Sequence, residues 1–190
     1  GLVAPMPVET HTTAEDRRFM RQALSLARRG EGHTRPNPPV GAVLVRGGRI
    51  VATGYHRCAG ERHAEVVALD DCPRAARGAT LYVTLEPCCT RGRTPPCTDR
   101  IVAEGVARVV AGCIDPNPGH AGRGLDRLRQ CGIEVSSGVC EADCRELAAP
   151  FAKRMGKGLP WVTLKLAMTL DGRIADRRGG SKWITGPPAR

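Results

Sequence analysis

Long apolar runs are missing from this chain of 190 residues. No stretch approaches the roughly eighteen consecutive apolar residues of a membrane-spanning helix, so we expect no membrane association. The apolar core of a signal peptide is also missing, because charged residues and a histidine interrupt the first twenty positions: Glu9, His11, Glu15, Asp16, Arg17 and Arg18.

Aromatic residues are scarce, at 3% of the chain, and none lies between Val83 and Pro150. The formal net charge is +10, which by itself is typical of proteins that bind nucleic acids. The charge of residues 1–150 is nearly balanced, however, with 20 basic and 17 acidic side chains. Residues 151–190 hold nine basic and two acidic side chains. A balanced body with few rings to stack on bases argues against a nucleic-acid partner.

Nine cysteines are many for this length, and their number is odd. A secreted disulfide scaffold requires a signal sequence and paired cysteines. The sequence instead indicates the reducing cytoplasm, with some thiols serving as metal ligands. Hydrophobic residues at 41% and charged residues at 25% are ordinary for a globular protein.

Alternating strands and helices predict a layered α/β domain over residues 12–155, after a loose leader over residues 1–11. Thr12 and Glu15 have the spacing of a capping box at the first helix. Pro150 is a point where the last helix can break. A Gly/Pro linker over residues 156–160 then precedes a new strand at residues 161–168, which we interpret as the beginning of a second, incomplete domain over residues 161–190.

The chemistry is concentrated in His63-Ala-Glu65, Pro87-Cys88 and Pro96-Cys97. A catalytic zinc site uses three nitrogen or thiolate ligands and leaves one position open for water. One histidine and two cysteines meet that requirement. Glu65, two residues from the histidine, is suited to carry a proton from the water to a leaving amine.

The spacing of the two cysteines narrows the class further. Zinc-dependent base deaminases have the signature H-x-E followed by P-C-x-x-C. Here eight residues separate Cys88 from Cys97, so the intervening loop must bulge over the site. This spacing argues against the ordinary cytidine and transfer-RNA adenosine deaminases.

Several stretches resemble the bifunctional riboflavin-biosynthesis deaminase/reductase family of bacteria. They are Thr34-Arg-Pro-Asn-Pro-Pro-Val-Gly41, Tyr82-Val-Thr-Leu-Glu-Pro-Cys88, Gly92-Arg-Thr-Pro-Pro-Cys97, Asp115-Pro-Asn-Pro118 and Ser181-Lys-Trp-Ile-Thr185. The resemblance implies a three-layer α/β/α, cytidine-deaminase-like domain with a mixed sheet. It also implies that a dihydrofolate-reductase-like domain begins after the linker, and that the protein self-associates.

The resemblance also implies roles for individual residues. His63, Cys88 and Cys97 would hold Zn²⁺, and Glu65 would be the proton donor. The substrate would be the small molecule 2,5-diamino-6-(5-phosphoribosylamino)pyrimidin-4(3H)-one, contacted by Asn37, His56 and Arg93. In the second domain, which uses NADPH, Ala167 and Trp183 fall on the cofactor side and Ser181 on the substrate side.

The sequence departs from the family pattern at two places near these motifs. Cys89-Thr90 stands where the family usually has Ser-His, and Gly119-His120 replaces a usually apolar pair. We interpret His120 as an exposed loop residue. Six cysteines are interpreted as buried or incidental thiols: Cys58, Cys72, Cys113, Cys131, Cys140 and Cys144.

Two alternatives remain open at this point. A transfer-RNA deaminase would share the zinc chemistry and would account for the net charge. A non-catalytic zinc module would have a closed site with four ligands, whereas the sequence supplies three evident ones.

Overall fold

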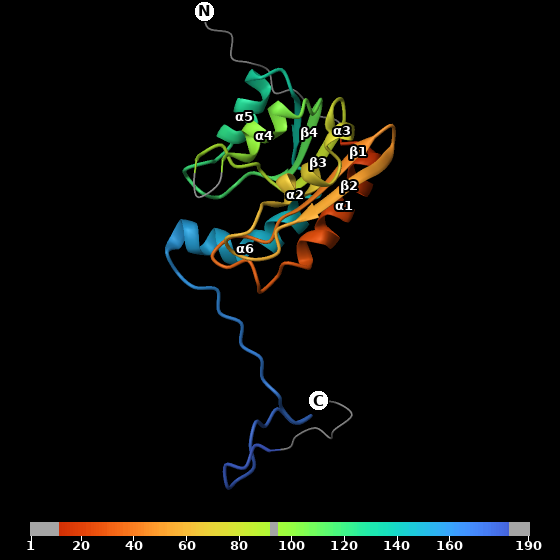
Figure 1. The fold of residues 1–190 in the computed structure, drawn as a ribbon. Helices are drawn as coiled ribbons and strands as arrows, with labels where there is room; N and C mark the ends of the chain where they lie inside the picture. Colours follow the sequence, from red (N-terminus) through yellow and green to blue (C-terminus); the bar gives the residue numbers. More distant parts are fainter. Residues whose placement is uncertain (1–11, 92–94, 183–190) are drawn as a thin grey trace, which may run out of the picture. The chain divides into compact units, whose positions relative to one another are not determined.

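The computed structural model describes residues 12–91 and 95–182. The expected leader at residues 1–11 lies outside this range. The chain divides into two units, Gly1–Pro160 and Trp161–Arg190, and the helices and strands of the described residues all lie in the first. They follow one another (Figure 1) as α1 (Ala14–Arg28), β1 (Gly41–Arg46), β2 (Arg49–Tyr55), α2 (Ala64–Asp71), α3 (Pro73–Ala76), β3 (Thr80–Leu85), α4 (Cys97–Ala103), β4 (Arg108–Cys113), α5 (Arg123–Gln130), β5 (Glu134–Ser137) and α6 (Glu141–Lys157).

The five strands form one mixed sheet in the order β2-β1-β3-β4-β5. β1 is antiparallel to β2 and β3, whereas β3, β4 and β5 are parallel to one another. In the β1–β2 hairpin, Gly47 and Gly48 have φ angles of 57° and 72°, which glycine adopts without steric cost. Because β3 and β4 are parallel, the loops that follow Leu85 and Cys113 leave the same edge of the sheet.

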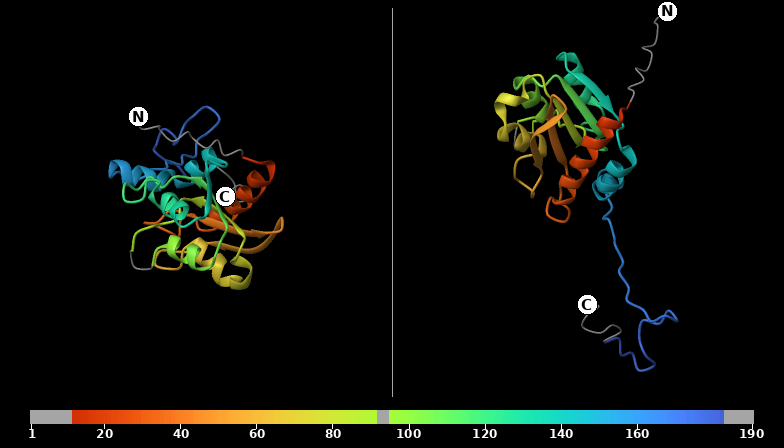
Figure 2. Two further views of the ribbon diagram at one scale, coloured as in Figure 1. Left: turned by 90° about the horizontal axis from the view of Figure 1, so that it is seen from above. Right: turned by 90° about the vertical axis from the view of Figure 1, so that its right-hand side faces the viewer.

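Helices cover both faces of this sheet (Figure 2), so the predicted three-layer α/β/α architecture is confirmed. Residues of α1 and α6 pack on one face in a cluster that includes Phe19, Met20, Ala23, Leu24, Val43, Val110, Cys144 and Leu147. Residues of α2 to α5 pack on the other face in a cluster that includes Ala64, Ala68, Leu69, Ala76, Leu81, Ile101, Leu125 and Leu128.

The first helix begins one residue later than the sequence pattern predicts. Its N-cap is Thr13, whose hydroxyl accepts a hydrogen bond from the Asp16 N–H at 2.9 Å, while the Asp16 carboxylate accepts one from the Thr13 N–H at 3.2 Å. The predicted capping box of Thr12 and Glu15 is therefore wrong. Thr12–Glu15 and Thr13–Asp16 both have the spacing of a capping box. The contacts that Asp16 makes with distant strands favour the second pair.

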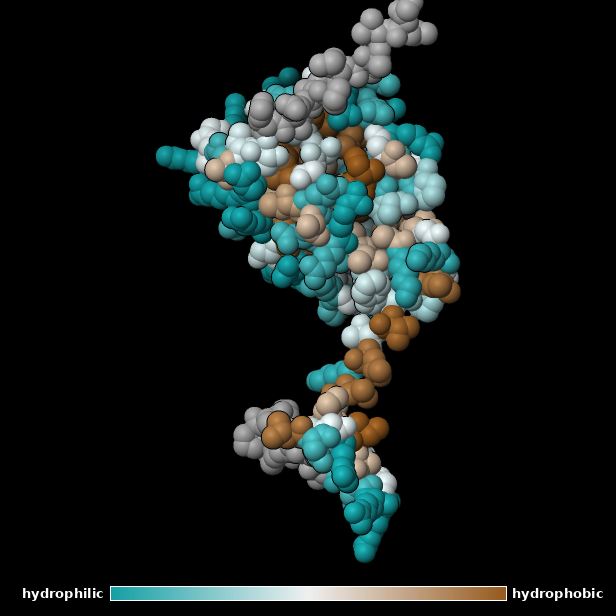
Figure 3. All heavy atoms as spheres, turned by 180° about the vertical axis from the view of Figure 1, so that it is seen from behind, coloured by the Kyte–Doolittle hydropathy of each residue, from teal (hydrophilic) through white to brown (hydrophobic). Residues whose placement is uncertain are grey.

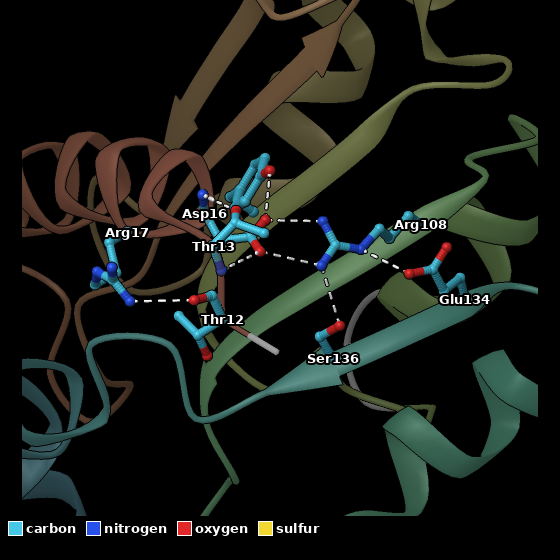
Figure 4. Close-up of polar contacts among 8 residues, drawn as sticks. Thr12, Thr13, Asp16, Arg17, Arg108, Glu134 and Ser136 are labelled. Atoms are coloured by element: carbon cyan, nitrogen blue, oxygen red, sulfur yellow. Dashed lines mark hydrogen bonds and ion pairs between the residues drawn. The ribbon is translucent and has the colours of Figure 1, made fainter. Parts of the chain in front are cut away.

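These contacts form a buried polar network around Asp16 (Figure 4). The carboxylate accepts hydrogen bonds from the Tyr82 hydroxyl at 2.9 Å and from both terminal nitrogens of Arg108, at 2.8 and 3.3 Å. Arg108 also donates to the Ser136 hydroxyl at 3.2 Å, and its Nε lies 3.0 Å from the Glu134 carboxylate. The network therefore joins the start of α1 to strands β3, β4 and β5.

The last helix does not break at Pro150, because α6 is continuous from Glu141 to Lys157. A proline removes one hydrogen bond of the helix. Leu147 before it is buried in the core and Phe151 after it is half-buried, so side chains on both sides of the proline hold the helix in place.

The strand predicted for residues 161–168 is absent from the structure of the second unit. A strand needs a neighbour to pair with its N–H and C=O groups, and the described residues 161–182 contain no other strand. Apolar side chains of this segment are exposed (Figure 3), among them Val162, Leu164, Leu166, Met168 and Leu170.

None of the helices within residues 12–91 and 95–182 is both long enough and apolar enough to cross a membrane.

Candidate metal and catalytic site

The candidate site is built where β3 and the first turns of α2 and α4 meet. His63 is the N-cap residue of α2, Cys97 is the first residue of α4, and Cys88 lies three residues after the end of β3. Gly54 allows α2 to approach the sheet, since a Cβ there would lie 2.2 Å from the Ala64 carbonyl oxygen. The loop and helix starts that carry the donors are thus fixed by the fold.

Three donor atoms converge at this point. Nδ1 of His63 lies 3.3 Å from Sγ of Cys97 and 3.7 Å from Sγ of Cys88, and the three donor atoms all lie within 4.8 Å of one another. The Cys88 sulfur also accepts a hydrogen bond from the Cys97 N–H at 3.3 Å. Among the described residues this is the one group of three or more histidine, cysteine or acidic side chains with such geometry.

The donor set fits zinc. One imidazole nitrogen and two thiolates are ligands that zinc prefers, and three of them leave a fourth tetrahedral position for water or substrate. The hydrogen bond from the Cys97 thiol lowers the pKa of Cys88, and the His63 ring acts in the same direction. A lowered pKa favours the thiolate, which is the form of cysteine that binds metals. The same hydrogen bond and burial raise the pKa of Cys97.

Glu65 lies in the first turn of α2 and is 4% exposed. Burial, together with the negative charge of Cys88, raises the pKa of its carboxyl group to about 7. A carboxyl group with such a pKa can both take up and release a proton near neutral pH.

Asn37 and His56, which are expected at the substrate from the family resemblance, are in direct contact. Nδ1 of His56 lies 3.1 Å from the Arg62 carbonyl oxygen, which can only accept, so this nitrogen carries the proton. Nε2 is then the acceptor for the Asn37 amide, 3.2 Å away. Burial lowers the pKa of His56, which favours this neutral form. Both ring nitrogens are engaged, so His56 orients the Asn37 amide.

His63, Cys88 and Glu65 line a cavity of about 330 Å³. Its lining includes residues that the sequence did not single out as site residues: Leu85, Glu86, Asp115, Asn117, His120, Phe151, Arg154 and Met155. Asp115 and Asn117 belong to the Asp-Pro-Asn-Pro turn after β4. The position of this turn at the end of a strand is a feature of the sequence from which both residues could have been predicted as site residues. The three residues of α6 have no comparable signal in the sequence, because only the packing of α6 shows which side faces the cavity.

Glu86 connects two loops of this site through hydrogen bonds of its buried carboxylate. It is buried, and its carboxylate accepts hydrogen bonds from the backbone N–H groups of Asp115, Gly122 and Gly124 at 2.8 to 3.0 Å. Gly124 is required at its position, since a Cβ would lie 2.1 Å from the Pro87 carbonyl oxygen. The loop between β4 and α5 is therefore tied to the segment that carries Cys88.

The interpretation of His120 as an exposed residue is wrong. It is 9% exposed, lines the cavity and lies against Cys89 and Thr90. A loop residue is buried when another loop packs across it, and this depends on contacts that are distant in the sequence.

Four further residues were predicted to belong to a functional site: Arg93, Ala167, Ser181 and Trp183. Arg93 and Trp183 lie outside the described residues. Ala167 and Ser181 are exposed in the second unit.

An α/β/α sandwich with a histidine, two thiols and a buried glutamate beside the carboxyl end of β3 defines the class of zinc-binding deaminases. A family model described as the cytidine and deoxycytidylate deaminase zinc-binding region matches residues 13–113. The chain belongs to this family. A second model, described as the RibD C-terminal domain, matches residues 160–190.

Known proteins confirm the resemblance seen in the sequence. The chain is 55% identical to the riboflavin biosynthesis protein RibD of Escherichia coli (strain K12) over 176 residues, which are 93% of this chain and 48% of that protein. It is 53% identical to RibD of Aquifex aeolicus (strain VF5) over 175 residues, 92% of this chain and 49% of that protein.

A solved structure agrees with this. The Thermotoga maritima diaminohydroxyphosphoribosylaminopyrimidine deaminase/5-amino-6-(5-phosphoribosylamino)uracil reductase superimposes with a TM-score of 0.86 at 49% identity, covering 90% of this chain and 50% of that one. The chain spans about half the length of the curated relatives it matches.

Proposed function

We propose that residues 12–155 hydrolyse the ring 2-amino group of 2,5-diamino-6-(5-phosphoribosylamino)pyrimidin-4(3H)-one, a reaction of riboflavin biosynthesis. The observation that carries the proposal is the convergence of His63, Cys88 and Cys97 beside buried Glu65 at a cavity large enough for a pyrimidine. The similarity to RibD proteins over nearly the whole chain supports this choice of substrate.

In this proposal His63, Cys88 and Cys97 hold zinc, which when bound is a Lewis acid that makes water nucleophilic near neutral pH. Glu65 takes one proton from the water and passes it to the ring nitrogen that is double-bonded to carbon 2, and then moves the remaining hydroxyl proton to the leaving amine. The water oxygen forms a bond to ring carbon 2, the bond from that carbon to the amino nitrogen breaks, and ammonia leaves. The carbon is left as a carbonyl, so the products are ammonia and 5-amino-6-(5-phosphoribosylamino)uracil.

Asn37 would bind the pyrimidine edge. One N–H of its amide is used by His56, which leaves the second N–H and the carbonyl oxygen for the substrate. His56, with both nitrogens engaged, would act as a positioning residue for Asn37.

Arg154 would bind the substrate's phosphate. Among the described residues that line the cavity it is the one with a permanent positive charge. It projects from α6, on the same helix as Phe151, whose ring offers an apolar surface to the ribose. Arg93 is a second candidate for this role, by resemblance.

The direct test is to incubate the zinc-loaded chain with the phosphoribosyl diaminopyrimidinone and to measure ammonia and the uracil product. We expect turnover that a chelator abolishes and added zinc restores. No turnover by a folded, zinc-loaded sample would contradict the proposal. Conversion of adenosine to inosine in transfer RNA, without pyrimidine deamination, would favour the alternative that the sequence left open.

A substitution of Arg154 tests the phosphate contact separately. We expect Arg154→Gln to raise KM for the phosphorylated substrate about tenfold or more, the usual scale for one charge-assisted hydrogen bond, with little change for the dephosphorylated pyrimidine. The matched control is Arg145→Gln on the same helix, where the arginine pairs with Glu141 away from the cavity. Equal losses with both substrates would assign Arg154 another role.

The remaining expectations extend the proposal to the longer relatives. The linker expected over residues 156–160 overlaps the last two residues of α6, which ends at Lys157. Residues 161–190 would be the beginning of the NADPH-dependent reductase domain. Ala167 and Ser181 are exposed, and the described residues 161–182 form no helix or strand. Self-association and a cytoplasmic location, where thiol ligands stay reduced, remain predictions.

A further inference from the structure

His120 occupies a fixed position in the loop between β4 and α5. Its backbone N–H donates to the Asn117 carbonyl at 2.8 Å, and its own carbonyl accepts from the Arg123 N–H at 2.8 Å. These two hydrogen bonds hold the backbone on both sides of the residue. The direction of the buried imidazole is therefore set by the loop and not by solvent.

The ring places both nitrogens against the two residues that follow Cys88. Nδ1 accepts a hydrogen bond from the Cys89 N–H at 3.4 Å, and the Cys89 sulfur lies 3.6 Å from the same nitrogen. Because a backbone N–H can only donate, Nδ1 is an acceptor, and the neutral ring carries its proton on Nε2. Nε2 lies 3.5 Å from the Thr90 hydroxyl oxygen, which can accept it.

The same loop also holds the chain on the other side of Cys88. Glu86, two residues before Cys88, is bound by the N–H groups of Asp115, Gly122 and Gly124. Cys88 thus lies between two anchors, Glu86 on one side and the His120 ring on the other. A metal ligand held in this way loses little conformational freedom when it binds, and such supporting contacts affect metal affinity.

We propose that His120 is a positioning residue for the metal site, which holds the Cys89–Thr90 segment so that the Cys88 sulfur stays directed at His63 and Cys97. Thr90 and His120 face each other across a single contact. An imidazole attached at position 90, with a small apolar residue at position 120, would occupy much of the same space. This inference concerns metal retention and does not depend on which substrate is deaminated.

The test measures how fast zinc passes from the folded holoprotein to a coloured chelator at neutral pH. His120→Leu keeps the volume and removes the acceptor, and we expect zinc release to become about 10- to 100-fold faster. His120→Asn can place its Oδ1 where Nδ1 lies and should recover most of the difference. His33→Leu, at an exposed loop histidine, is the matched control and should release zinc at the original rate.

Three results would overturn the proposal. One is release from folded His120→Leu at the original rate, with a change only in KM for the substrate, because this would make His120 a substrate contact. Another is release from His120→Asn as fast as from His120→Leu. The third concerns the exchange variant Thr90→His/His120→Val. If the proposal holds, this double variant releases zinc more slowly than His120→Val alone. Strictly additive effects of its two substitutions would show that the side chains do not share one role.

Discussion

Two buried carboxylates lie in the first turns of two helices, and their pKa values move in opposite directions. Asp16 in α1 is 1% exposed and Glu65 in α2 is 4% exposed. Burial raises the pKa of Asp16, but hydrogen bonds from Arg108, Thr13 and Tyr82 outweigh it and hold this pKa at about 2.

Within residues 12–91 and 95–182, no arginine contributes to the pKa of Glu65, and burial raises this pKa to about 7. The comparison shows that the donors around a buried carboxylate decide its use. With an arginine it is locked as an anion and joins parts of the fold. Without one it remains free to exchange a proton.

The sharpest way to test the proton-exchange side of this comparison is Glu65→Gln. The amide keeps the shape and cannot carry the proton, so we expect deamination to fall by about 10²- to 10⁴-fold. Zinc content, measured by metal analysis, should be unchanged. A variant that retained activity within about threefold of the original would assign proton transfer to another group.

Asp16→Asn tests the structural role of the carboxylate that Arg108 holds as an anion. The substitution leaves Arg108 without its main anionic partner, and we expect the free energy of unfolding to fall by about 2–4 kcal/mol. Urea unfolding gives the value, and kcat of the folded variant should be unchanged. Asp126→Asn, which removes an exposed ion pair with Arg129, is the control and should cost about 1 kcal/mol or less.

The pH dependence of stability separates the two carboxylates without changing the active site. The pKa of Asp16 is about 2 in the folded chain and 3.8 as its ordinary value. The stabilisation by Asp16 is therefore complete at pH values above its ordinary pKa. It is lost as the pH falls through the pKa that Asp16 has in the folded chain. Between about pH 5 and pH 2 we expect about 2 kcal/mol of the unfolding free energy to be lost through this group. Urea unfolding at several pH values should show this part of the loss disappearing in Asp16→Asn.

The smallest effect concerns the cap that helps hold Asp16. Thr13→Ala removes the hydroxyl that accepts the Asp16 N–H, and we expect it to cost about 1 kcal/mol. Thr12→Ala, one residue earlier, should cost about 0.5 kcal/mol or less, as expected for a position outside the cap. Thermal or urea unfolding of the two variants would decide between the capping residues. Equal costs would mean that Thr13 contributes nothing as a cap.

The metal donors could be predicted because their signal is local. Cys88 and Cys97 each follow a proline, and His63 precedes the acidic residue Glu65 by two positions, as in the H-x-E signature. Strand β3 (Thr80–Leu85) has a local signal of the same kind, because Leu81, Tyr82, Val83 and Leu85 form a short, mostly apolar run.

What could not be predicted depends on contacts distant in the sequence. Thr12 and Thr13 both precede an acidic residue by three positions, and only the contacts of Asp16 with Arg108 and Tyr82 select between them. His120 appears polar and exposed in a loop until the loop packs on Cys89. The predicted strand after residue 160 had the right pattern but finds no partner within residues 161–182.

The hydrogen bonds of Glu86 have a practical consequence for protein engineering. Its carboxylate takes three N–H groups from the loop between β4 and α5, and Gly124 lies directly against the Pro87 carbonyl. The two loops that border the cavity are therefore parts of one module. A chimera that takes the loop between Cys88 and Cys97 from a related deaminase must therefore also take residues 115–124. Either loop alone would lose its matching hydrogen-bond partners at the Glu86 carboxylate.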